Sequence, residues 1–99
     1  MSTASLRNVY LELTNQQLPA LASSRKWPVR FNHCFQRIVL DHLFQDSWYH
    51  HLSRKRAAYR QLSEAQLKEA VAFIQQLIDG PDELLQEANR RSLRWRGKG

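Results

Sequence analysis

The sequence is poor in cysteine, glycine and proline. Its 99 residues include one cysteine, Cys34, which excludes an internal disulfide and any multi-cysteine zinc or iron–sulfur site. Three glycines and three prolines exclude collagen-like chains and most turn-rich β folds. No apolar run approaches the roughly 20 residues of a membrane span, and the first residues lack the layout of a signal peptide. We therefore expect one small, soluble, cytoplasmic domain with no membrane partner.

The composition also argues against a bound cofactor or metal. All three glycines lie within residues 80–99, so Walker and dinucleotide-binding fingerprints are absent. Two pairs of candidate ligands, His33–Cys34 and His50–His51, are adjacent in sequence. Adjacent helical side chains point about 100° apart, so neither pair can chelate a metal as two histidines four residues apart would. We expect no cofactor and no metal site, and we expect Cys34 to act as a small apolar residue.

Positive charge is what the chain has in excess. Fifteen lysines and arginines against nine acids give a net charge of +6 at neutral pH. The excess falls in two groups that contain no acid. The first basic block consists of Arg54, Lys55, Arg56 and Arg60, and the second of Arg90, Arg91, Arg94, Arg96 and Lys98. Because residues 63–89 between them hold six acids and one base, the blocks favour either a polyanion partner or pairing with this acidic segment.

The clearest helix is predicted over residues 64–79. Ser63 and Gln66 have the spacing of a capping box. Apolar residues then recur three and four positions apart, as one buried helix face requires: Leu67, Ala70, Val71, Ile74, Leu77 and Ile78. Gly80 suits a left-handed residue after the helix end, and Pro81 suits the start of a second helix over residues 82–91. The two helices are expected to form a hairpin.

A second buried helix is predicted over residues 29–44, after Trp27 and Pro28. One apolar stripe runs along it: Phe31, Cys34, Phe35, Ile38, Val39 and His42. Leu6, Val9, Tyr10 and Leu13 fit a short N-terminal helix, which Pro19 is expected to interrupt.

These elements predict an all-α fold, a single small domain of four or five helices with a C-terminal helical hairpin. Residues 1–26 are assigned to the N-terminal helix and a connector, and residues 27–91 to the core. Residues 92–99 are assigned to a basic tail. Because Leu93 and Trp95 give this tail apolar surface, we expect it to fold back and bury Trp95 near residues 27–37.

His33, Arg37 and Asp41 are the candidates for catalysis. Two successive steps of four residues place them on one helix face. Asp41 could hold Arg37 while the remaining guanidinium donors face an anionic group. The competing interpretation is a solvated ion pair on the protein surface.

The two basic blocks give the main functional hypothesis. Arginine and lysine neutralise phosphates, and the neighbouring Trp48, Tyr49 and Trp95 could stack on unpaired bases. We therefore predict a small basic protein that binds nucleic acid or another polyanion. Two alternatives stay open, a small enzyme or enzyme-accessory domain built on the His/Arg/Asp face, and a module that binds another protein. The tryptophans also suit a core or lid role.

Part of the sequence resembles a family of small, uncharacterised bacterial proteins. The resemblance rests on the segment from Trp27 through Phe35, on Leu40-Asp41 and on the ending from Ser92 to Lys98. Members of that family often carry an acetyltransferase-related label. The resemblance implies that the two segments belong to one structural unit. It transfers no catalytic residue, since the glycine-containing pyrophosphate loop of acetyltransferases is absent here.

Overall fold

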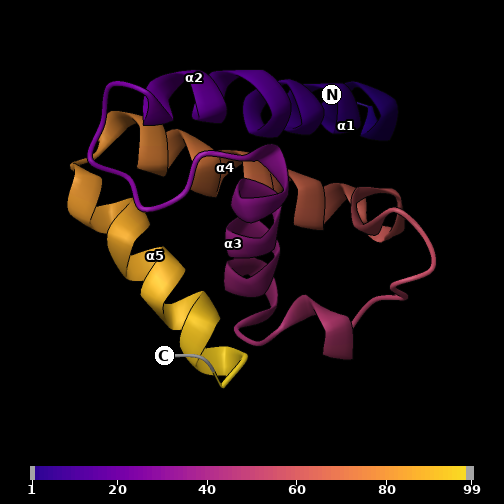
Figure 1. The fold of residues 1–99 in the computed structure, drawn as a ribbon. Coiled ribbons are helices and arrows are strands. Elements are labelled where there is room, and N and C mark those ends of the chain that lie inside the picture. The colour runs from indigo at the N-terminus through magenta and orange to yellow at the C-terminus, as the bar shows by residue number, and fades with distance from the viewer. Residues whose placement is uncertain (1, 98–99) are drawn as a thin grey trace.

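The computed structural model describes residues 2–97, which form helices joined by turns and loops and contain no strand (Figure 1). The α-helices are α1 (Thr3–Glu12), α2 (Leu18–Ala22), α3 (Asn32–Phe44), α4 (Glu64–Asp79) and α5 (Asp82–Trp95). Two 3-10 turns, η2 (Trp48–His50) and η3 (Ala58–Gln61), lie between α3 and α4. The predicted all-α class is confirmed. Within the described residues, no helix combines the length and the apolarity needed to cross a bilayer.

The N-terminal helix passes through Pro19, so the predicted interruption there is wrong. Ser2 caps α1, and a π-helical turn, η1 (Leu13–Gln17), joins α1 to α2. Proline has no N–H and crowds the carbonyl four residues earlier, which breaks a regular helix. The wider π turn accommodates it, and the Leu18 N–H bonds five residues back to the Leu13 carbonyl.

The central helix, α3, begins three residues later than predicted. It starts at Asn32, and Phe31 is the extended residue that precedes it, with φ −102° and ψ 150°. Phe31 therefore leaves the apolar stripe in which the sequence placed it, and its side chain is 65% exposed. The helix ends at Phe44, and the left-handed backbone of the next residue, Gln45 (φ 54°), turns the chain toward η2.

The capping box at the start of α4 is confirmed. Ser63 Oγ accepts from the Gln66 N–H, and Gln66 Oε1 accepts from the Ser63 N–H. The left-handed conformation predicted for Gly80 is wrong, since its backbone is extended. Glycine is needed there for space, because a Cβ atom would lie 2.8 Å from the backbone oxygen of Gln76 and would also collide with Leu84.

The last helix, α5, continues through Trp95, so the first four residues of the predicted tail, 92–95, are helical. Ser92 contacts Arg37, as expected for a tail that folds back, but Trp95 lies with Ser47 and Tyr49 near η2 and is only partly buried. Figure 1 shows the end of α5 beside the link that leaves α3. The helix extends into the predicted tail because its buried face runs without interruption from Leu85 to Ser92, which are both fully buried.

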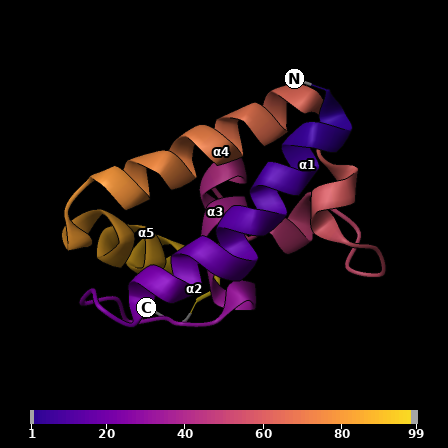
Figure 2. The same ribbon diagram turned by 90° about the horizontal axis from the view of Figure 1, so that it is seen from above.

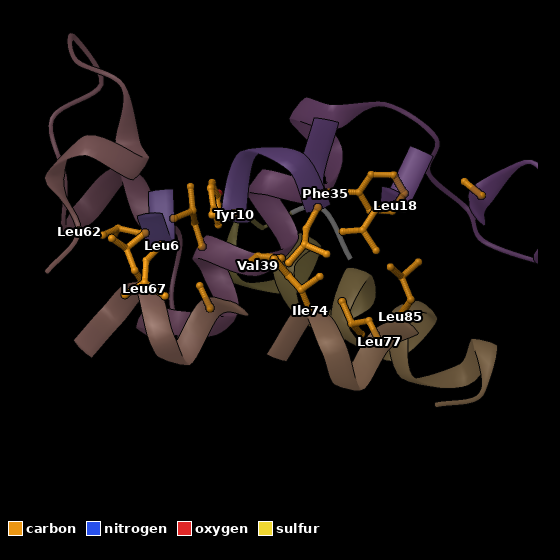
Figure 3. Close-up of a cluster of buried hydrophobic side chains, with 14 of the residues drawn as sticks. Leu6, Tyr10, Leu18, Phe35, Val39, Leu62, Leu67, Ile74, Leu77 and Leu85 are labelled. Atoms are coloured by element: carbon orange, nitrogen blue, oxygen red, sulfur yellow. The ribbon is translucent and has the colours of Figure 1, made fainter. Parts of the chain in front are cut away.

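Every long helix contributes to one apolar core, and α3 lies at its centre. The rod of α1 and α2 crosses above α4 and α3, and α4 and α5 both pack on α3 (Figures 1 and 2). Figure 3 shows the core, where Tyr10 lies near Val39 and Leu18 near Phe35, while Leu6 lies beside Leu62 and Leu67. Leu62, Leu67, Ile74, Leu77 and Leu85 close it from the C-terminal half. The predicted core, residues 27–91, was therefore too narrow at its N-terminal end.

Arg25 ties the N-terminal rod to the turn between α4 and α5. Its guanidinium bonds the Asp82 carboxylate and donates to the carbonyls of Ile78, at 2.9 Å, and Gly80, at 2.6 Å. These carbonyls belong to the end of α4, where no further helical N–H is available. Arg25 thus caps α4 from another element.

Leu77→Ala should lower the free energy of unfolding by about 2–4 kcal/mol, because Leu77 is 1% exposed and its removal leaves a cavity. Urea unfolding followed by circular dichroism measures the loss. Leu84→Ala is the matched control, since Leu84 is 44% exposed. Equal losses in the two variants would show that the Leu77 face is not core.

Asp82→Asn should make the stability of the protein fall less steeply as the pH is lowered below about 4. The hydrogen bond from Arg25 lowers the pKa of Asp82, so its contribution to stability is present above about pH 4 and is lost as the pH falls below that value. Thermal unfolding between about pH 2 and pH 6 tests this. The difference between Asp82→Asn and the unsubstituted protein should shrink toward low pH, and a difference that stays constant over this range would contradict the prediction.

Candidate anion-binding groove

The interface between α3 and α5 is polar. Arg37 and Asp41 on α3 face Asn89 and Ser92 of α5 and Arg96 at its C-cap. Each set shares one helix face, since the spacings are four residues on α3 and three and four residues on α5. The two helices are therefore matched by hydrogen bonds as well as by apolar packing.

Asp41 is fully buried at this interface. Its carboxylate accepts two hydrogen bonds from Arg96, Nε at 2.8 Å and Nη2 at 3.0 Å. It also accepts from Ser92 Oγ at 2.6 Å and from the backbone N–H of Trp48 at 2.9 Å. The expectation that Asp41 holds Arg37, and the alternative of a solvated pair, are both wrong. Arg96 pairs with the Asp41 carboxylate instead, because α5 places Arg96 next to α3.

Arg37 bonds only neutral groups. Its Nη1 donates to Ser92 Oγ at 2.7 Å and its Nη2 donates to Asn89 Oδ1 at 2.8 Å. Within residues 2–97 it has no salt bridge, although its side chain is half-buried. A guanidinium has five donor hydrogens, so most of its capacity is left for another acceptor. Its positive charge is held in place without a counter-charge in direct contact.

The first basic block lies on a loop that Gln61 holds in shape. Gln61 Oε1 accepts from the Ser53 N–H at 2.9 Å, and its Nε2 donates to the Ser53 carbonyl at 2.8 Å. The same amide nitrogen reaches the carbonyls of Arg56, at 3.3 Å, and Ala57, at 3.4 Å. This basic loop, residues 53–57, presents Arg54, Lys55 and Arg56 to solvent. In the described part of the chain none of these three side chains has a salt bridge.

The two basic blocks meet at Tyr49. The guanidinium carbon of Arg54 lies 4.0 Å from the centre of the Tyr49 ring, and that of Arg96 lies 4.4 Å from it. Hydrogen bonding to Arg96, together with the charges of both arginines, lowers the pKa of Tyr49. Trp48 packs edge-on against the same ring, with 4.7 Å between ring centres. One aromatic ring thus holds an arginine from each basic block, because its face attracts cations.

A groove of about 360 Å³ opens between α3 and the basic loop. We call it the α3 groove, and it is lined by His33, Gln36, Arg37, Leu40, Trp48, Tyr49, Arg56, Ala57 and Ala58. This lining contains two guanidiniums and one imidazole but no carboxylate. An adjoining hollow of about 460 Å³ is lined by Ser47, Tyr49, His50, Arg54, Trp95 and Arg96, again without an acid. Both surfaces favour an anionic ligand.

Three other arginines of the second basic block share one carboxylate, which offsets part of their charge. Arg90, Arg91 and Arg94 all approach the carboxylate of Glu87, at 2.7, 3.5 and 3.4 Å. Their charge lowers the pKa of Glu87, with the hydrogen bond from Arg90 as the largest cause. Pairing with the acidic segment, one of the two sequence-based alternatives, therefore applies to these three arginines. Lys98 lies outside the described residues.

Arg60 and the remaining histidines stand apart from the groove. Arg60 packs on the ring of its neighbour Tyr59. His50 and His51 both contact Asp46, at 3.1 and 3.2 Å, and the hydrogen bond with His50 lowers the pKa of Asp46. Among residues 2–97, no three His, Cys, Asp or Glu side chains form a group suited to hold a metal. Cys34 is a partly buried free thiol.

Sequence reasoning missed Asn89, Ser92 and Gln61. The first two continue the inward face that Leu85 and Ala88 begin, so polar residues on an apolar face were a usable signal. Gln61 gave no such signal, because its four bonds to the basic loop depend on how that loop closes. Comparison of the chain with protein-family models, with curated proteins and with solved structures gives no match.

Arg96→Met should lower the free energy of unfolding by about 3–5 kcal/mol, because it leaves the buried Asp41 carboxylate without its charged partner. Arg94→Met is the control, since its side chain is 58% exposed and surface pairs contribute about 1 kcal/mol or less. Denaturant unfolding of both variants measures the difference. Losses of similar size would mean that the Asp41–Arg96 pair does not anchor α5.

Proposed function

We propose that the protein binds nucleic acid or another polyanion in the α3 groove. The observation that carries the proposal is the charge of the groove lining, where Arg37 and Arg56 meet with no carboxylate between them. Phosphate esters repeat along a nucleic acid, and arginine side chains contact them through paired N–H donors. We also propose a cytoplasmic location, where such ligands occur and where the single thiol stays reduced.

One positively charged side chain at the groove is fixed by hydrogen bonds, and several others are exposed. Arg37 is fixed by Ser92 and Asn89, so it loses little conformational freedom when an anion binds. Arg54, Lys55 and Arg56 are exposed on a loop whose backbone Gln61 fixes. A rigid donor beside flexible ones suits a ligand with many equivalent phosphates rather than one unique group.

The enzyme alternative, to which the acetyltransferase-related resemblance also points, has less support from the geometry. His33 and Arg37 line the α3 groove, but Asp41 is enclosed by Arg96, Ser92 and Trp48. A carboxylate with four hydrogen-bond donors around it has no free position from which to take a proton from a substrate. We therefore place Asp41 among the residues that hold the site together.

Changing Arg54, Lys55 and Arg56 together to alanine should weaken binding and reduce its dependence on salt. Each phosphate contact that is removed lowers the slope of log K against log salt by about one unit, so the triple variant should lose up to about three units. Fluorescence anisotropy with a labelled oligonucleotide, measured from about 20 to 200 mM salt, gives both quantities.

The matched control is the triple alanine variant of Arg90, Arg91 and Arg94. It removes the same formal charge from residues that already share Glu87, so it should retain most of the affinity. Equal effects of the two variants would indicate a general charge effect and no specific groove. Absence of binding to DNA and RNA by the unsubstituted protein at low salt would refute nucleic acid as the ligand.

A further inference from the structure

An exposed aromatic side chain, Phe31, stacks on His33, which lines the α3 groove. Phe31 precedes α3 at its N-cap position and makes no side-chain capping hydrogen bond. Serine, threonine, aspartate and asparagine are preferred there, because their oxygens accept from free helical N–H groups. The Phe31 ring is also 65% exposed, so it adds little to the core. Phenylalanine at this position therefore benefits neither the helix start nor the packing.

Phe31 is connected to the groove by His33, on which its ring stacks. The two rings lie parallel, with an angle of 4° between their planes and 5.7 Å between their centres. His33 is itself exposed and lines the α3 groove together with Arg37 and Arg56. The groove follows α3 from His33 to Leu40, a length of about 10 Å, which matches about three nucleotides at the spacing of a stacked strand.

We propose that Phe31 and His33 form a stacking platform for an unpaired base, and that the ligand of the groove is single-stranded nucleic acid. This inference rests on the proposed function, since the phosphates of the strand are held by the arginines of the groove. A base inside a duplex is stacked on both faces and is not available to Phe31. A single strand exposes its bases, and every base has a face that can stack on an aromatic ring.

Other aromatic residues of the groove support the same ligand. Trp48 and Tyr49 line it, and Tyr49 is 40% exposed between two guanidiniums. Alternation of aromatic rings with positive charges is the pattern of surfaces that bind single strands without base-specific contacts. A ligand that carried phosphates alone would use the arginines and leave Phe31 without a role.

The test compares three ligands, a labelled single-stranded oligonucleotide, a duplex of the same sequence and inorganic polyphosphate. The unsubstituted protein should bind the single strand more tightly than the duplex. Phe31→Ser should weaken single-strand binding by about 5- to 100-fold, as expected for the loss of one base–aromatic stack. Affinity for polyphosphate should not change. Serine is a favoured N-cap residue, so this variant should keep its helix content and thermal stability.

Three further variants complete the experiment. Phe31→Trp should retain single-strand affinity, because it preserves an aromatic face. Leu84→Ser, at another exposed apolar residue, should leave all affinities unchanged. Arg56→Ala should weaken binding of the single strand and of polyphosphate alike, since it removes a phosphate contact.

The possible failures are distinguishable. If no ligand binds at low salt, the proposed function and the platform are both wrong. If the ligands bind but Phe31→Ser retains full single-strand affinity, the platform is wrong and the proposed function stands. The platform is also wrong if Phe31→Ser weakens single-strand and polyphosphate binding equally, or if it abolishes self-association instead, which would make Phe31 a contact between two copies of the chain.

Discussion

The pairing of a buried carboxylate, Asp41, with Arg96 is the interaction on which the arrangement of α3, α5 and the α3 groove depends. A charge out of contact with water must be compensated, and Arg96 does this with two hydrogen bonds from the last turn of the chain. Because Ser92 bonds both Asp41 and Arg37, the same contact fixes the orientation of the groove arginine. The end of the chain thereby positions a residue 59 places earlier.

The two basic blocks differ in whether an acidic residue lies next to them. Glu87 lies among Arg90, Arg91 and Arg94, so each of these arginines has a counter-charge close by and part of their charge is offset. The basic loop has no acid beside it, and Gln61 holds it by neutral hydrogen bonds alone. Net charge alone does not distinguish these cases. What matters for a ligand is which positive charges are left without a close counter-charge.

Local sequence rules gave the regular elements and failed where distant groups intervene. The capping box of α4 and the buried stripes were predictable, because neighbours three and four residues apart decide them. Continuation of the helix through Pro19 depends on a π turn. Gly80 is extended where Leu84 packs against it and Arg25 bonds its carbonyl. Phe31 was also mispredicted. Its spacing placed it on the buried stripe of α3, but it precedes the helix and is exposed.

By itself, the sequence determined the all-α class, most of the helices, the positive charge and its division into two blocks, since all of these depend on composition and local spacing. Tertiary structure alone decided the partners: Asp41 with Arg96 rather than Arg37, Arg54 with Arg96 at Tyr49, and Gln61 with the basic loop. The physical reason is that hydrogen bonds and ion pairs form between groups that packing brings within about 3 Å. Spacing along a chain sets which face a residue occupies, but not what lies opposite that face.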